Sequence, residues 1–121
     1  MASPEAFEKI EEIAVSDGRF LPAAYLFLLR CIEHARQRLD REGHVTGQEL
    51  VESARQLAMA EYGPMAKAVL NHWGVQRTDD FGSIVFLMID HGLLSKTAED
   101  SPDDFRDRFD FDTEFVQNYR W

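Results

Sequence analysis

The chain of 121 residues is short enough for one domain and long enough to bury a core without a disulfide or a metal. Its net charge of −9 lies in two acidic flanks, residues 1–17 and 98–114, which disfavours binding to nucleic acid or to an anionic membrane. The longest apolar run, residues 23–29, is too short to span a membrane, and the single cysteine, Cys31, fits a reducing, cytoplasmic setting.

Capping residues and apolar positions at helical spacing predict a mainly α-helical chain. Thr46 and Glu49 have the spacing of a capping box, and Gly74 has the place of a glycine that ends a helix. Segments 22–39 and 79–91 carry the widest apolar faces, so we expect them at the centre of the fold. The predicted helices cover residues 4–17, 22–39, 46–62, 65–73, 78–91 and 101–109, with a last turn or two from residue 112.

The expected architecture is a compact all-α bundle of five to seven helices, which forms a single domain over residues 1–121. Two further features are predicted as options. His44-Val45 and the segment 93–97 could pair as a minimal two-stranded ribbon. The second and third helices could form an EF-hand-like helix-loop-helix without metal.

The stretch RLDREGHVTGQEL, residues 38–50, has the spacing of a calcium loop. With Gly43 at the sixth place, acceptable loop positions are filled by Asp40, Glu42, Thr46 and Glu49. Arg38 falls on the first position, where the ion needs an oxygen ligand. We therefore prefer a helix that ends at Gly43, followed by a capping box that begins at Thr46. A degenerate EF-hand-like calcium-binding domain stays open as an alternative.

No catalytic, metal or cofactor motif is complete in the sequence, and we expect neither a cofactor nor a catalytic residue. Cys31 and His34 lie one helical turn apart, but a zinc site needs three or four converging ligands. Asp80 to Gly82 has the letters of a kinase motif without its glycine-rich loop or lysine, so we interpret Gly82 as a small residue that lets another helix approach. An enzyme with a scattered active site remains a second alternative, because geometry defines such sites.

Aromatic and acidic residues alternate in the tail FDFDTEFVQNYRW. Phe109 and Phe115 are expected to dock on the core. Phe111, Tyr119 and Trp121 are expected to contact a protein partner or a second copy of the chain, because aromatic side chains anchor interfaces. Together with the missing catalytic motifs, this tail favours a non-catalytic protein-interaction or regulatory module.

Several phrases occur in a distinctive order: HVTGQEL, VLNHWGV, TDDFGSIVF, LLSKTAEDSPDDF and FDF. Together they resemble an uncharacterised family of small conserved hypothetical bacterial proteins, found chiefly in planctomycetes and verrucomicrobia. The resemblance covers nearly the whole chain and implies a stand-alone cytoplasmic domain. It implies no activity, ligand or catalytic residue.

Overall fold

A computed structural model describes residues 4–94 and 101–117. Within these ranges the chain forms five α-helices, three short helical turns and no strand, which confirms the all-α prediction. The elements in chain order are α1 (Pro4–Asp17), α2 (Pro22–Arg38), α3 (Gly47–Tyr62), η1 (Gly63–Met65), α4 (Ala66–His72), α5 (Thr78–Asp90), η2 (Pro102–Phe105) and η3 (Asp112–Gln117). Turns η1 and η2 are 3-10 helices, and η3 is a short π-helix.

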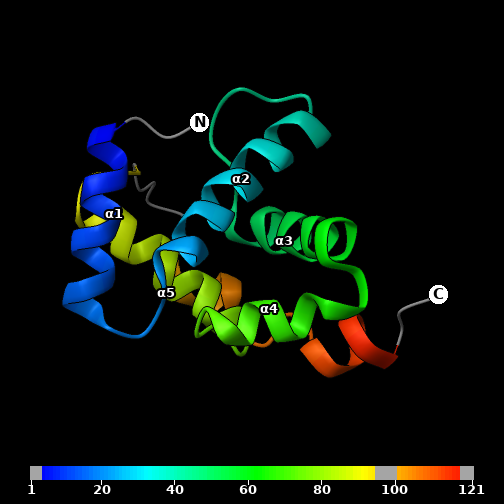
Figure 1. Ribbon diagram of the computed structural model, residues 1–121. Helices are drawn as coiled ribbons and strands as arrows, with labels where there is room; N and C mark the ends of the chain where they lie inside the picture. The colour runs from blue at the N-terminus through cyan, green and yellow to red at the C-terminus, as the bar shows by residue number, and fades with distance from the viewer. Residues whose placement is uncertain (1–3, 95–100, 118–121) are drawn as a thin grey trace.

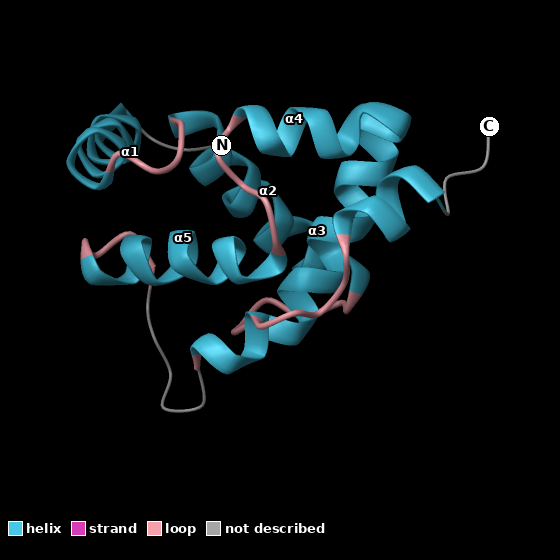
Figure 2. Ribbon diagram, turned by 90° about the horizontal axis from the view of Figure 1, so that it is seen from below, coloured by secondary structure: helices cyan, strands magenta, loops and turns pink. Residues whose placement is uncertain are grey.

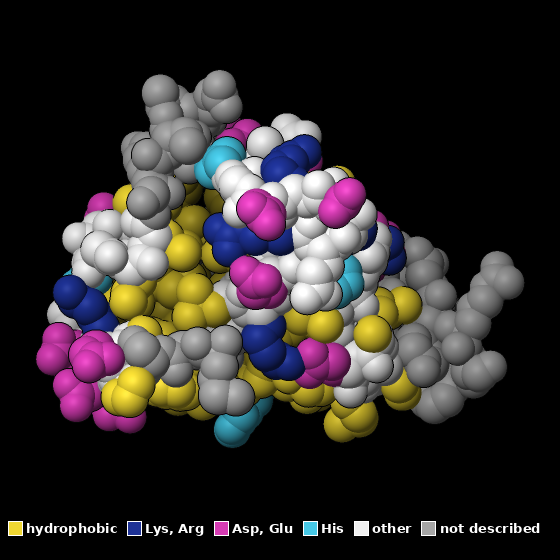
Figure 3. Space-filling model, turned by 90° about the horizontal axis from the view of Figure 1, so that it is seen from above, with side chains coloured by type: hydrophobic (Ala, Val, Ile, Leu, Met, Phe, Trp, Pro, Cys, Tyr) yellow, Lys and Arg dark blue, Asp and Glu magenta, His cyan; other side chains and the backbone are white. Residues whose placement is uncertain are grey.

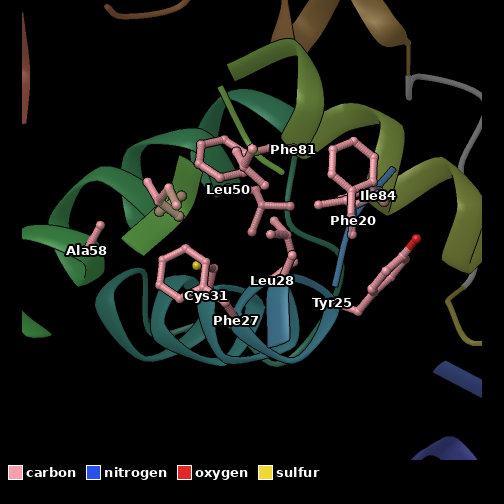
Figure 4. Close-up of a cluster of buried hydrophobic side chains, with 14 of the residues drawn as sticks. Phe20, Tyr25, Phe27, Leu28, Cys31, Leu50, Ala58, Phe81 and Ile84 are labelled. Carbon is pink, nitrogen blue, oxygen red and sulfur yellow. The ribbon is translucent and has the colours of Figure 1, made fainter. Parts of the chain in front are cut away.

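Helix α2 lies at the centre of the fold, in contact with α1, α3 and α5 (Figure 1, Figure 2). Its buried face consists of Ala24, Tyr25, Phe27, Leu28, Cys31, Ile32 and Ala35. Figure 4 shows Leu28 of α2 pointing toward Leu50 of α3 and Phe81 of α5, so the three helices share one core. Full burial of a leucine or phenylalanine side chain stabilises the fold by about 1.5–3 kcal/mol. The predicted central position of the second and fifth helices is confirmed.

The end of α2 agrees with the predicted range 22–39 to within one residue, but Gly43 is not the residue that marks it. The helix ends at Arg38, well before Gly43, and the chain turns at Asp40, whose φ is 50°. Aspartate tolerates this left-handed conformation better than most residues, because its short side chain can form local hydrogen bonds. Gly43 has no positive φ and does not end the helix.

Phe105 of η2 fixes the C-terminal segment to the helices. A Cβ atom on Gly82 of α5 would lie 2.8 Å from the Phe105 ring, and one on Gly47 of α3 would lie 3.0 Å from it. The prediction that Gly82 permits a close approach is therefore confirmed. The predicted helix over residues 101–109 is wrong beyond Phe105, because Arg106 is extended and Asp107 has a φ of 48°.

Polar contacts at the start of α5 hold the same segment. The Thr78 side chain is fully buried; its hydroxyl donates to the Phe105 carbonyl at 2.7 Å and accepts from the Arg108 amide at 2.9 Å. A carboxylate oxygen of Asp79 accepts from the Asp107 amide at 2.9 Å. The Phe105 carbonyl and the amides of Asp107 and Arg108 thus find partners on α5, because no regular helix supplies them with partners.

The tail aromatics pack inside the fold. Phe111 is only 3% exposed and lies 5.3 Å from Phe115 and 6.0 Å from Phe81, measured between ring centroids. The prediction that Phe111 contacts a partner is therefore wrong: the chain turns back over the core and buries this ring. Phe115 is fully buried and Phe109 is partly buried against it, as predicted. Tyr119 and Trp121 lie outside the described residues.

The predicted ribbon is not seen in the part of it that the structure describes. His44 and Val45 have no strand geometry, and neither do Leu93 and Leu94. Residues 95–97 lie outside the described ranges. Val45, Leu93 and Leu94 nevertheless line one hollow together, so the two segments lie close in space without pairing as strands.

Candidate functional site

A hydrophobic groove opens between the C-terminal halves of α2 and α5, and we call it the α2–α5 groove. Its volume is about 490 Å³. The lining side chains come from four parts of the chain: Ile32, Arg36, His44, Val45, Gly47, Leu50, Val85, Phe86, Ile89, Leu93, Leu94 and Phe105. Figure 3 shows hydrophobic side chains gathered in a hollow on the face seen from above, with a basic side chain at its border.

The groove has a buried floor and half-buried walls. Ile32, Leu50 and Val85 form the floor and are at most 9% exposed. The walls consist of hydrophobic residues that pack against the core and still reach solvent: Val45, Phe86, Ile89, Leu93 and Leu94. An apolar side chain placed in the groove would remove these wall residues from water, and each 100 Å² of apolar surface so buried contributes about 2.5 kcal/mol.

Arg36 is the charged side chain on the groove wall with defined partners. Its Nε donates to the Gly43 carbonyl at 3.2 Å, and its Nη1 donates to Glu33 at 2.9 Å. The side chain remains 36% exposed. No aspartate or glutamate lines the groove within the part of the chain that the structure describes. The described lining of the groove therefore combines an apolar surface with one arginine, whose charge is paired with Glu33 outside the lining.

Two further arginines shape the loop that borders the groove. Arg38 donates to the Ser53 hydroxyl at 3.2 Å and to the Glu49 carbonyl at 3.0 Å. Arg41 donates to the Glu49 carboxylate at 2.7 Å. Arg41 thus pairs with a carboxylate that the calcium-loop pattern would assign to the ion.

The predicted capping box at the start of α3 is confirmed. The Thr46 hydroxyl accepts from the Glu49 amide at 3.1 Å, and the Glu49 carboxylate accepts from the Thr46 amide at 2.9 Å. The hydrogen bond from Arg41, followed by that of the Thr46 amide, lowers the pKa of Glu49 from 4.5 to about 2. The carboxylate is therefore held in its charged form.

Replacing Glu49 with glutamine should lower the free energy of unfolding by about 1 kcal/mol at neutral pH, because the cap loses its charge-assisted bonds. The folded-state pKa lies below the unfolded one, so this contribution is fully present above pH 4.5 and is lost as the pH falls toward 2. Denaturant unfolding of both proteins across this range measures the effect. In Arg41→Gln the pKa of Glu49 should lie closer to its unfolded value, so the stability from Glu49 should be lost over a narrower range of pH. If the difference in unfolding free energy between wild type and Glu49→Gln stayed constant down to pH 2, the lowered pKa of Glu49 would be contradicted.

The other candidate site residues are placed as follows. Asp40 and Glu42 are exposed on the loop, whereas Thr46 and Glu49 serve the cap of α3. No group of three or more histidine, cysteine or acidic side chains that could hold a metal ion is found among the described residues. Cys31 is fully buried, and this burial raises the pKa of its thiol. A thiol in this state is a poor nucleophile.

No protein-family model, curated protein or solved structure matches the chain. The resemblance to the uncharacterised bacterial family therefore stays a prediction. Among the described residues, no helix combines the length and the apolar character that crossing a membrane requires.

The groove itself was not predicted from the sequence. Its walls come from residues that are distant in the chain, and helical spacing cannot place them beside one another. One signal was present: Phe86 and Leu87 extend the apolar face of α5 most of the way round the helix. A helix with this pattern needs partners on several sides. In the structure α2 and α3 cover part of that surface, while Phe86 and Ile89 line the groove.

Proposed function

We propose that the protein is a non-catalytic interaction module that receives apolar side chains of a partner protein in the α2–α5 groove. The observation that supports this proposal is the set of half-buried hydrophobic walls around a buried apolar floor. Hydrophobic surfaces of this kind, bordered by polar residues, are typical of binding sites. The proposal includes a cytoplasmic setting, in which the lone thiol of Cys31 stays reduced.

The test is a selection from a displayed library of short peptides against the full chain. Peptides enriched on wild type should bind Ile89→Asp at least about tenfold more weakly, because a carboxylate on the wall cannot be buried against an apolar ligand. Val15→Asp is the matched control, since Val15 is 85% exposed on α1 and does not line the groove. Affinity for this control should equal that for wild type.

Amide chemical shifts add a readout of position. Binding should change the amide chemical shifts of the groove-lining residues on α2, on α5 and in the loop between α2 and α3. Leu93→Ser serves as a second groove variant if Ile89→Asp unfolds, which thermal denaturation detects. An absence of enriched peptides, or equal binding to wild type and both groove variants, would overturn the proposal.

A further inference from the structure

We infer that the α2–α5 groove takes an amphipathic helix of a partner protein, with an acidic residue of that helix paired with Arg36. This inference rests on the proposed function and names the chemistry of its partner. Three properties of the groove carry it: its local charge, the way Arg36 is held, and the secondary structure around it.

The described lining of the groove carries a cationic side chain, whereas the chain as a whole is acidic. The sequence has 22 acidic residues against 13 lysines and arginines. The described groove lining contains Arg36 and no carboxylate. Complementary charges steer partners together and exclude wrong ones, so this surface favours an acidic ligand over a basic one.

Arg36 is positioned to exchange its present partner for a ligand. The bond from its Nε to the Gly43 carbonyl holds the side chain of Arg36 between the groove and a second hollow, which Asp40 and Glu42 line. Its ion-pair partner, Glu33, lies one turn earlier on the same helix, and that side chain is 61% exposed. Exposed pairs of this kind contribute little to stability, so a ligand carboxylate can replace Glu33 at small cost.

The surroundings of the groove favour a helical ligand. Peptides bind proteins as added strands, as polyproline helices on aromatic grooves, or as amphipathic helices in hydrophobic grooves. Residues 4–94 and 101–117 contain no strand whose edge could accept another strand. Among the described residues, the groove lining contains phenylalanine but neither tyrosine nor tryptophan, and residues of α2 and α5 line two of its sides. An amphipathic helix is therefore the ligand that we infer, with apolar residues at helical spacing in the groove between α2 and α5.

The experiment uses a displayed library of short amphipathic helices with randomised polar positions, selected on the full chain. Enriched sequences should carry aspartate or glutamate at one polar position. The enriched peptide is then made with glutamate, glutamine or lysine at that position, and the dissociation constants are measured by fluorescence anisotropy. On wild type, the glutamate form should bind roughly two- to fivefold more tightly than the glutamine form, as expected for a partly exposed ion pair.

Variants of Arg36 and of Glu33 show whether the preference for the glutamate peptide comes from Arg36. The preference for glutamate should vanish on Arg36→Gln and change to a preference for lysine on Arg36→Glu. Glu33→Gln should strengthen binding of the glutamate peptide, because the arginine no longer has a competing carboxylate. Added salt should reduce the preference on wild type.

The outcomes separate the two proposals. Equal binding of the glutamate and glutamine forms to wild type, or an unchanged preference on Arg36→Gln, overturns the acidic-helix inference and leaves the interaction module standing. Failure of every amphipathic helix to bind overturns the acidic-helix inference alone, and failure of the peptides of both libraries overturns both proposals. Binding of palmitate at the groove without binding of any peptide would also overturn both, since the groove would then be a site for a lipid.

Discussion

Phe105→Ala is expected to lower the free energy of unfolding by about 3–5 kcal/mol. The Phe105 ring is 3% exposed and lies 6.2 Å from the ring of Phe86 in an edge-to-face arrangement. It also fills the space that Gly47 and Gly82 leave open. Removing the ring leaves a cavity among α3, α5 and η2. This cavity cannot close unless one of the helices moves. Denaturant unfolding followed by circular dichroism measures the loss.

Gly82→Ala tests the same contact from the other side. The new methyl group would lie 2.8 Å from the Phe105 ring, and overpacking of this kind costs roughly 1–3 kcal/mol. In the Phe105→Ala background the cost should fall because the ring is gone, but part of it should remain, because the Cβ atom of residue 105 still lies 2.9 Å from the new methyl group. Val116→Ala is the control: Val116 is 53% exposed, and its replacement should change stability by less than about 0.5 kcal/mol. Purely additive effects of the two core changes would contradict the described packing.

Gly74→Ala is expected to lower the free energy of unfolding by about 2–5 kcal/mol. This loss is the sum of the cost of the backbone conformation and the cost of a steric clash. Gly74 has a φ of +94°, and a Cβ there would lie 2.2 Å from the Arg19 carbonyl oxygen. Positive φ alone costs a residue with a side chain about 1–2 kcal/mol. The clash adds to this cost because its other partner is backbone, which cannot move aside as a side chain can. Thermal and denaturant unfolding both report the change.

Two other glycines separate the conformational strain from the clash. Gly18 has a φ of +79°, and no atom lies within 4 Å of the place that an added methyl group would take, so Gly18→Ala should show the strain alone. Gly43 has neither positive φ nor a close neighbour, so Gly43→Ala should be neutral or slightly stabilising. The expected order of stability loss is Gly74, then Gly18, then Gly43. A loss at Gly74 equal to that at Gly18 would show that the backbone relieves the clash.

The helices were predictable because their signals are local. The Thr46 capping box and the glycine at the end of α4 act through residues within one turn, and both are confirmed. The stop of α2 was assigned to Gly43, whereas Asp40 adopts the left-handed conformation that glycine usually supplies. Three arginines then hold the following loop through acceptors that include residues of the next helix. A local pattern does not specify such distant bonds.

The tail and the groove were the least predictable parts. Phe111 and Trp121 belong to the same alternating pattern, and that pattern cannot tell a ring that turns back onto the core from one at a surface. The groove depends on the distance between Ile89 on α5 and Arg36 on α2, which only the packing of the core determines. Apolar periodicity indicated that α5 was surrounded, but not which of its sides would face solvent.

The packing of Phe105 also has a consequence for the order of synthesis. Residues 101–117 leave the ribosome after all five α-helices, yet they supply the ring that covers Gly47 and Gly82 and the bonds that satisfy the start of α5. A nascent chain that ends at α5 therefore exposes apolar surface that the finished protein buries, and such surface makes folding intermediates prone to aggregation. Emergence of residues 101–117 from the ribosome, rather than formation of the helices, should be the step at which this apolar surface is covered.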